Sequence, residues 1–175
     1  MKRVYCALSL AVLMLVSSAA APIAKWKRIV LKDAGTIVLP DSWNVITENL
    51  PVLENAYGPG VTSRCLMTAE NDDKSLMSVL VYWPSEGRTS SQAAGDIASS
   101  LRRNNAVSSP PLAGEIRTKD ITASSVTYQT RRNTHQKVAA FIHDNKIFCI
   151  ISDYSSSDEH AFTTLVRRII SYWSF

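Results

Sequence analysis

The stretch on either side of Asp144-Asn145 constrains the fold more than any other part of this chain. Segments 137–143 and 146–154 are rich in apolar and β-branched residues, and an Asp-Asn pair tolerates the positive φ angles of a two-residue hairpin loop. Such a loop fixes the register of its strands. It sets the pairs Phe141–Phe148 on one face of the hairpin, and Ile142–Ile147 and Ala140–Cys149 on the other. Because both faces are apolar, other elements must cover the sheet on each side.

A second segment also predicts a sheet that is buried on both faces. Leu76 to Trp83 is almost continuously apolar, which is typical of a strand covered from above and below. The remaining strands are expected where apolar runs or alternation are bounded by turn residues. They are 26–32, 36–39, 43–50, 61–70, 115–123 and 125–132.

Two helices are predicted, each beginning at a capping box. Thr89 and Gln92 form the first box, and Ser156 and Glu159 form the second. The second helix carries one apolar stripe, made of Phe162, Leu165, Val166, Ile169, Ile170 and Trp173. The pattern predicts an α+β fold in which helices flank an antiparallel sheet.

The first residues have the order of a secretory signal peptide. Lys2 and Arg3 precede an apolar run over 7–16, and small residues follow at 17–21. The run is roughly ten residues long, whereas about 20 are needed to span a bilayer. We expect cleavage after Ala20, a periplasmic or secreted protein, and one domain over 21–175. No cysteine sits among the small residues at the end of the run, so no lipid anchor or other stable membrane anchor is expected after cleavage.

The charge and the cysteines of the expected mature chain limit its partners and its chemistry. Removing residues 1–20 leaves 17 basic and 15 acidic residues, a balance that gives no argument for binding nucleic acid. Two cysteines remain, Cys65 and Cys149, both in apolar strand-like segments. An oxidising compartment permits a disulfide between them, and the alternative is two buried thiols.

A catalytic or metal-binding motif is not recognisable in the sequence. HExxH, GxSxG and the P-loop pattern are absent. Asp153, Asp158, Glu159 and His160 could form a metal or acid–base site, but a solvated helix N-terminus with favourable charges is the simpler interpretation. We therefore expect no enzyme activity, no cofactor and no metal.

A loop and several basic pairs are the candidate binding residues. Segment 54–60 contains two glycines and a proline, which predict a projecting turn around Tyr57, Gly58 and Pro59. Arg64 is the nearest basic residue along the chain. Tyrosine and arginine are enriched at binding hot spots. Arginine pairs also occur at 102–103, 131–132 and 167–168, where ordinary solvated residues are the alternative interpretation.

In three features the chain resembles the PsbP-like superfamily, which includes the Mog and DcrB-like envelope proteins. They are the strand-to-turn step Val38-Leu39-Pro40-Asp41-Ser42-Trp43, the mid-chain helix after a long apolar strand, and the closing helix that runs into Ile169-Ile170-Ser171-Tyr172-Trp173-Ser174-Phe175. The resemblance implies an α/β/α sandwich around an antiparallel sheet. It also implies members that mostly bind other proteins and are not enzymes.

The expected function is that of an exported, non-catalytic domain of the cell envelope that binds another protein. An inhibitor or immunity protein of a secreted toxin, or an adaptor or chaperone, would fit this class. The alternative is a periplasmic protein that binds a small molecule or lipid between helix and sheet. A hydrolase with an unrecognised site is a third hypothesis.

Overall fold

The computed structural model describes residues 25–54, 62–83, 87–104, 109–130 and 134–175. The predicted signal peptide over 1–20 and the loop residues Tyr57, Gly58 and Pro59 lie outside the described residues. Within the described part, no helix is both long enough and apolar enough to cross a bilayer.

Eight strands form one antiparallel sheet with the order β3-β5-β6-β10-β9-β8-β7, and β4 pairs with β5 beside β3. The bounds of these strands are β3 Asn44–Ile46, β4 Val52–Glu54, β5 Thr62–Glu70, β6 Leu76–Trp83, β7 Leu112–Arg117, β8 Thr122–Gln129, β9 Thr134–His143 and β10 Lys146–Ser155. A smaller sheet contains β1 Trp26–Leu31 and β2 Gly35–Pro40. The helices are α1 Ser90–Asn104 and α2 Glu159–Ser171.

The predicted hairpin is confirmed at the centre of the sheet. Asp144 and Asn145 have φ angles of 45° and 56°, as a primed two-residue turn requires. The three predicted cross-strand pairs all occur. The hairpin extends further than predicted, because Thr134 still pairs with Ser155.

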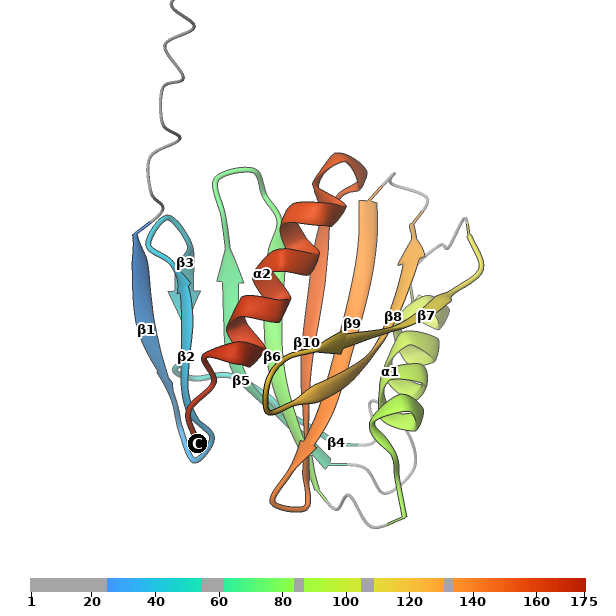
Figure 1. Ribbon diagram of the computed structural model, residues 1–175, viewed down its shortest axis with the longest axis horizontal. Coiled ribbons are helices and arrows are strands. Elements are labelled where there is room, and N and C mark those ends of the chain that lie inside the picture. Colours follow the sequence, from blue (N-terminus) through green and yellow to red (C-terminus); the bar gives the residue numbers. More distant parts are fainter. Residues whose placement is uncertain (1–24, 55–61, 84–86, 105–108, 131–133) are drawn as a thin grey trace, which may run out of the picture.

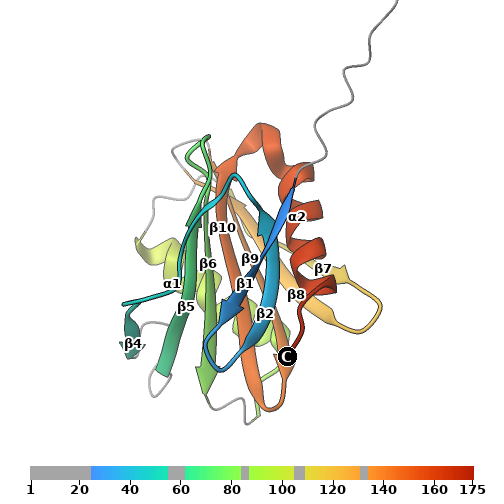
Figure 2. The same ribbon diagram turned by 90° about the vertical axis from the view of Figure 1, so that its left-hand side faces the viewer.

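The two helices lie on opposite faces of the sheet, as Figures 1 and 2 show, so the predicted flanking arrangement is confirmed. Ala94, Ile97 and Ala98 of α1 pack on one face, in a core that includes Ala140 and Cys149. On the other face α2 buries its stripe against a core that includes Phe141 and Phe148. The buried stripe residues are Phe162, Val166, Ile169, Ile170 and Trp173, while Leu165 is half-buried.

The β1–β2 hairpin covers the rest of the α2 face and is held there by the residues after α2. Ile37 and Leu39 of β2 are fully buried in the α2-side core. Thr36 and Ser174 exchange two backbone hydrogen bonds of 2.7 and 2.9 Å, so the tail forms a short bridge beside β2. Figure 2 shows this small sheet lying across the larger one, next to the chain end marked C.

One of the two predicted capping boxes forms. The amide of Thr89 donates to Oε1 of Gln92 at 2.8 Å, and the amide of Gln92 donates to Oγ1 of Thr89 at 3.1 Å. The second prediction is wrong: a 3₁₀ turn over Ser156–Asp158 precedes α2, whose N-cap is Asp158 and has no side-chain capping bond. The extended strand β10 runs directly into this turn, so the helix begins one turn later.

Several strand boundaries also differ from the prediction. Strand β7 begins three residues earlier and ends six residues earlier than expected, and strand β8 lies three residues earlier, because Thr118 and Ile121 close a tight turn. Oγ1 of Thr118 accepts the amide of Ile121 at 3.0 Å, and the amide of Thr118 donates to the Ile121 carbonyl at 2.9 Å. Strand 43–50 shortens to Asn44–Ile46 as Asn49 adopts a φ of 55°. Strand β4 was not predicted.

The two described cysteines form no disulfide. Cys65 on β5 and Cys149 on β10 are both opposite Leu80, because β6 runs between their strands. Two strand spacings separate their Cα atoms by about 10 Å. A disulfide needs a Cα separation below about 7 Å. The alternative of two buried thiols therefore describes this fold.

Candidate functional site

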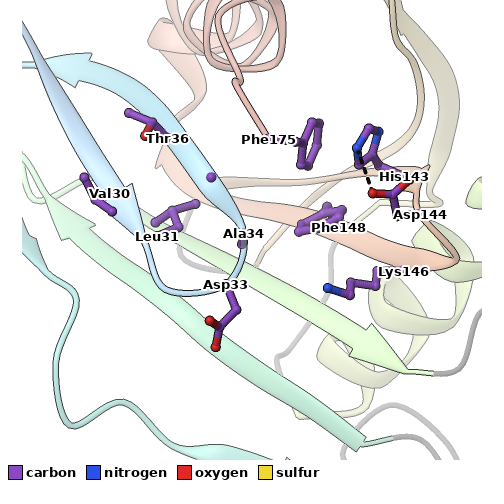
Figure 3. A pocket seen from close by; sticks show the side chains of 11 residues that line it. Val30, Leu31, Asp33, Ala34, Thr36, His143, Asp144, Lys146, Phe148 and Phe175 are labelled. Carbon is purple, nitrogen blue, oxygen red and sulfur yellow. Dashed lines mark ion pairs between the residues drawn. The ribbon is translucent and has the colours of Figure 1, made fainter.

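A pocket opens where the turn between β1 and β2 faces the turn between β9 and β10 (Figure 3). We call it the turn pocket. Its volume is about 360 Å³. The lining residues are Val30, Leu31, Asp33, Ala34, Gly35, Thr36, His143, Asp144, Lys146, Phe148 and Phe175. The pocket thus combines an aromatic lining with charged side chains of both signs.

Backbone geometry fixes one wall of the turn pocket. The amide of Ala34 donates to the carbonyl of Leu31 at 3.1 Å, and Asp33 and Gly35 take φ angles of 59° and 87°. Residue 35 must be glycine, since a Cβ there would lie 2.0 Å from the carbonyl oxygen of Ser174. The tight approach of Ser174 places the next residue, Phe175, over the pocket.

Aromatic contacts fix the opposite wall. The Phe175 ring stacks on the imidazole of His143 with centroids 3.6 Å apart and planes inclined by 12°. It also lies 5.2 Å from the ring of Phe148. Figure 3 shows Phe175 and His143 side by side, with Phe148 on the strand beneath them. These rings form a preorganised surface that needs little ordering on binding.

Ion pairs surround this aromatic surface and include one predicted binding residue. Nε2 of His143 lies 3.4 Å from Oδ2 of Asp144. Nη1 of Arg64 lies 3.6 Å from Oδ2 of Asp33, so the predicted residue Arg64 reaches the border of the turn pocket. Pairs as exposed as these contribute little to stability. Asp33 and Asp144 thus place largely exposed carboxylates beside the aromatic surface.

The segment that carries the predicted loop is anchored at the same end of the sheet. Glu54 of β4 pairs with Thr62 of β5, and these residues flank segment 55–61. Thr62 is opposite Trp83, at the end of β6 that also pairs with Ile147, next to the turn between β9 and β10. The described residues on each side of this segment, Glu54 and Thr62, thus lie at the turn-pocket end of the sheet.

The residues considered as a metal or acid–base site do not converge. Oδ2 of Asp153 accepts a hydrogen bond of 3.0 Å from Gln136, whereas Glu159 lies 3.1 Å from Nδ1 of His135. His160 is exposed on the first turn of α2. Among the described residues, no group of three or more His, Cys, Asp or Glu residues is placed to hold a metal ion.

A buried lysine under α2 was not singled out from the sequence. The side chain of Lys137 is 8% exposed, with Nζ donating to Oγ1 of Thr163 and lying 3.6 Å from Oε1 of Glu159. Burial lowers the pKa of the Lys137 amine, and the Glu159 carboxylate opposes that shift. Burial also raises the pKa of the nearby Tyr154 phenol. This polar cluster joins the sheet to α2, and its only sequence signal is a lysine at an inward strand position.

The basic pairs have different surroundings. Arg102 is half-buried and Arg103 is exposed, and residues 131–132 lie outside the described part of the chain. Arg167 and Arg168 are exposed on α2. The guanidinium of Arg168 lies over the indole of Trp26, with the carbon 3.9 Å from the ring centroid. This contact fixes the position of a cation on the α2 face.

The described elements define an antiparallel sheet sandwiched between helices, with a small second sheet. No family model matches the chain, and no curated protein matches it. Solved structures do match it, among them two of the same overall size. The solution structure of cyanobacterial PsbP (CyanoP) from Synechocystis sp. PCC 6803 matches with a TM-score of 0.58 and 10% identity, over 91% of this chain and 98% of the other.

The second match is the crystal structure of the Saccharomyces cerevisiae Ran-binding protein Mog1p. It has a TM-score of 0.55 and 12% identity, over 84% of this chain and 93% of the other. The chain therefore has the PsbP-like fold, as the sequence resemblance implied. At these identities the likeness establishes the fold, and function has to be argued from the site.

Proposed function

We propose that this chain is an exported protein, periplasmic or secreted, whose domain over 21–175 binds another protein and catalyses no reaction. The signal-like order of residues 1–20 supports export. The fold supports the binding role, because Mog1p, which has the same fold, is a Ran-binding protein. Nucleic acid and a stable membrane anchor have no part in this proposal.

The observation that carries the proposal is the composition and rigidity of the turn pocket. Val30 and Phe175 are 74% and 46% exposed although both line the pocket. Asp33 and Lys146 add one charge of each sign. An exposed phenylalanine is of a residue type enriched in protein interfaces, and charged groups beside it suit the polar rim of such an interface.

The segment containing Tyr57, Gly58 and Pro59 belongs to the same proposed surface. Its flanking residues lie at the turn-pocket end of the sheet, and Arg64 contacts Asp33 at the pocket border. A partner that covers the turn pocket would extend over this end of β5. An inhibitor of a secreted toxin, or an adaptor or chaperone, would use such a surface.

The buried ionisable groups support a role without catalysis. Lys137 is bound to Thr163 and Glu159, so its amine is used in joining β9 to α2. A catalytic amine or general base would have to face a substrate, whereas this side chain lies beneath the helix. The cluster is therefore interpreted as structural.

Affinity capture from an envelope extract tests the proposal. The wild-type domain should recover a partner protein. In calorimetry with that purified partner, the Val30→Glu variant and the Lys146→Glu variant should each bind at least tenfold more weakly than wild type. Both positions line the pocket. Asp72→Lys, an exposed charge reversal in the β5–β6 turn at the other end of the sheet, is the matched control and should bind normally.

Three results would contradict parts of this proposal. Unchanged affinity in both pocket variants would remove the turn pocket from the interface. Turnover of a substrate by the purified protein would overturn the non-catalytic role. Export predicts a mature N-terminus near Ala21 by mass spectrometry, and a chain retaining Met1 in the cytoplasm would contradict it.

A further inference from the structure

A second hollow lies on the α2 face, away from the turn pocket, between α2 and the strand pair β1–β2. We call it the helix groove. It has a volume of about 460 Å³, within the range of ligand sites. Its apolar lining includes Trp26, Trp43, Phe162 and Leu165, and the cation Arg168 lies at its side.

The floor of the helix groove is rigid and aromatic. Trp43 is buried and meets Phe162 edge to face, with centroids 5.9 Å apart. Phe162 in turn stacks on Tyr154 at 4.4 Å with planes 9° apart. This floor cannot collapse without unpacking the α2-side core, so the hollow is a stable feature of the fold.

The groove is elongated along α2. Ala161, Thr164, Leu165 and Arg168 all line it, and these positions repeat at the spacing of one helix face. The seven residue steps from Ala161 to Arg168 rise by about 10 Å along the helix axis. An extended acyl chain lying parallel to α2 fits this shape better than a compact ring.

The charge on the described lining of the groove is of one sign only. None of its described lining residues is acidic, whereas Arg168 and His160 are both present. The guanidinium carbon of Arg168 is held 3.9 Å from the Trp26 ring centroid and 5.6 Å from that of Tyr172. Among the described residues, Arg168 has no ion pair with a carboxylate. Its planar fork is thus positioned, and its charge is available to an anion.

We propose that the helix groove binds a small amphiphilic monocarboxylate, with the acyl chain along α2 and the carboxylate on Arg168. A single stacked guanidinium matches the bidentate geometry of one carboxylate. A ligand with several phosphate charges would require more cations than the groove provides. The site uses none of the residues that line the turn pocket, so it is independent of the proposed protein binding.

Titration of the purified protein with decanoate, below its micelle concentration, tests this assignment. Trp26 and Trp43 line the groove, so binding should change the intrinsic fluorescence in a saturable way. Decanol has the same chain without the charge and should bind at least tenfold more weakly, as expected for loss of a charge-assisted contact.

Four variants separate carboxylate recognition from apolar adsorption. Arg168→Gln should weaken decanoate binding at least tenfold and leave decanol unaffected, while Arg167→Gln on the neighbouring exposed position should bind both normally. Thr164→Glu places a carboxylate four residues before Arg168, where it pairs with the guanidinium, and should abolish the preference for decanoate. Thr164→Gln should retain that preference.

Two outcomes would overturn the proposal. One is the absence of any saturable fluorescence change with decanoate in protein whose circular dichroism shows it to be folded. The other is equal affinity of wild type and Arg168→Gln for decanoate, which would reduce the binding to apolar adsorption. Because Thr164 and Arg168 are exposed, none of these variants disturbs the core.

Discussion

The indole Nε1 of Trp173 donates a 2.8 Å hydrogen bond to the main-chain oxygen of Ala34, across 139 positions of sequence. The ring is also packed edge to face against Phe141 and Phe148, at 5.2 and 5.3 Å. One side chain therefore connects the turn of the small sheet to the central hairpin of the large one. The turn pocket exists because this connection holds the two turns opposite each other.

Replacement of Gly35 by Ala should destabilise the protein by about 2 kcal/mol or more, because the left-handed φ of 87° and the contact with Ser174 both oppose a Cβ. The matched control is Gly95→Ala inside α1, where no atom lies within 4 Å of the new Cβ. That change should stabilise the helix by about 0.5–1 kcal/mol. Chemical denaturation measures the free energy of unfolding of both variants. Equal changes in Gly35→Ala and Gly95→Ala would contradict the close approach of Ser174 to Gly35.

The local sequence pattern was sufficient to predict the centre of this fold. The Asp144-Asn145 turn sets the register of β9 and β10 through neighbouring residues alone, so the pairs on both faces could be predicted. The apolar segment of β6 and the stripe of α2 likewise report burial directly. From these, two covered faces and an antiparallel sheet follow.

Features that depend on distant contacts could not be predicted. Nothing near Gly35 in the sequence indicates that Ser174 lies against it, and nothing near Trp26 indicates Arg168. Of Tyr57, Gly58, Pro59 and Arg64, only Arg64 falls within the described chain, and its partner Asp33 could not be identified from the sequence. Both hollows are formed by segments that meet only in the folded protein.

Two buried tyrosines should respond differently to loss of their hydroxyl groups. Tyr128 donates a hydrogen bond to Oε1 of Gln136, whereas the Tyr154 hydroxyl has no hydrogen-bond partner among the described residues. Tyr128→Phe should cost about 1–2 kcal/mol of unfolding free energy, because it leaves a buried acceptor with one partner fewer. Tyr154→Phe should be neutral or stabilising by up to about 1 kcal/mol. The reverse order in urea denaturation would contradict the assignment.

Lys137 should make stability depend on pH in the alkaline range. Burial lowers its pKa in the folded protein, so between that value and the unfolded value of about 10.4 the unfolded state binds more protons. The contribution of Lys137 to the free energy of unfolding therefore rises with pH between its folded and unfolded pKa values. It is lowest at pH values below the folded pKa. Lys137→Met should stabilise the protein by about 1 kcal/mol at pH 7, and the difference from wild type should shrink towards pH 10.

The control for this measurement is Lys119→Met on an exposed turn, which should leave the pH profile of stability unchanged. Unfolding is followed between pH 7 and 10. The tyrosines, whose ordinary pKa is about 10, are the same in both proteins, so their titration cancels in the difference between Lys137→Met and wild type. A constant difference between Lys137→Met and wild type over this range would show that the desolvation of Lys137 does not govern the pH dependence.

Cys65 and Cys149 should both be thiols in the folded protein, because β6 separates their strands with Leu80 between them. Unfolding without reductant should therefore allow alkylation at both residues, with the same labelling as a sample reduced first. In the native state both should react slowly, since both are buried and burial raises the pKa of the Cys65 thiol, opposed by a hydrogen bond with the Met67 backbone. Peptide mass spectrometry assigns the labels. A Cys65–Cys149 cross-linked peptide in unreduced protein would require β5 to leave its place beside β6, and would contradict the strand order.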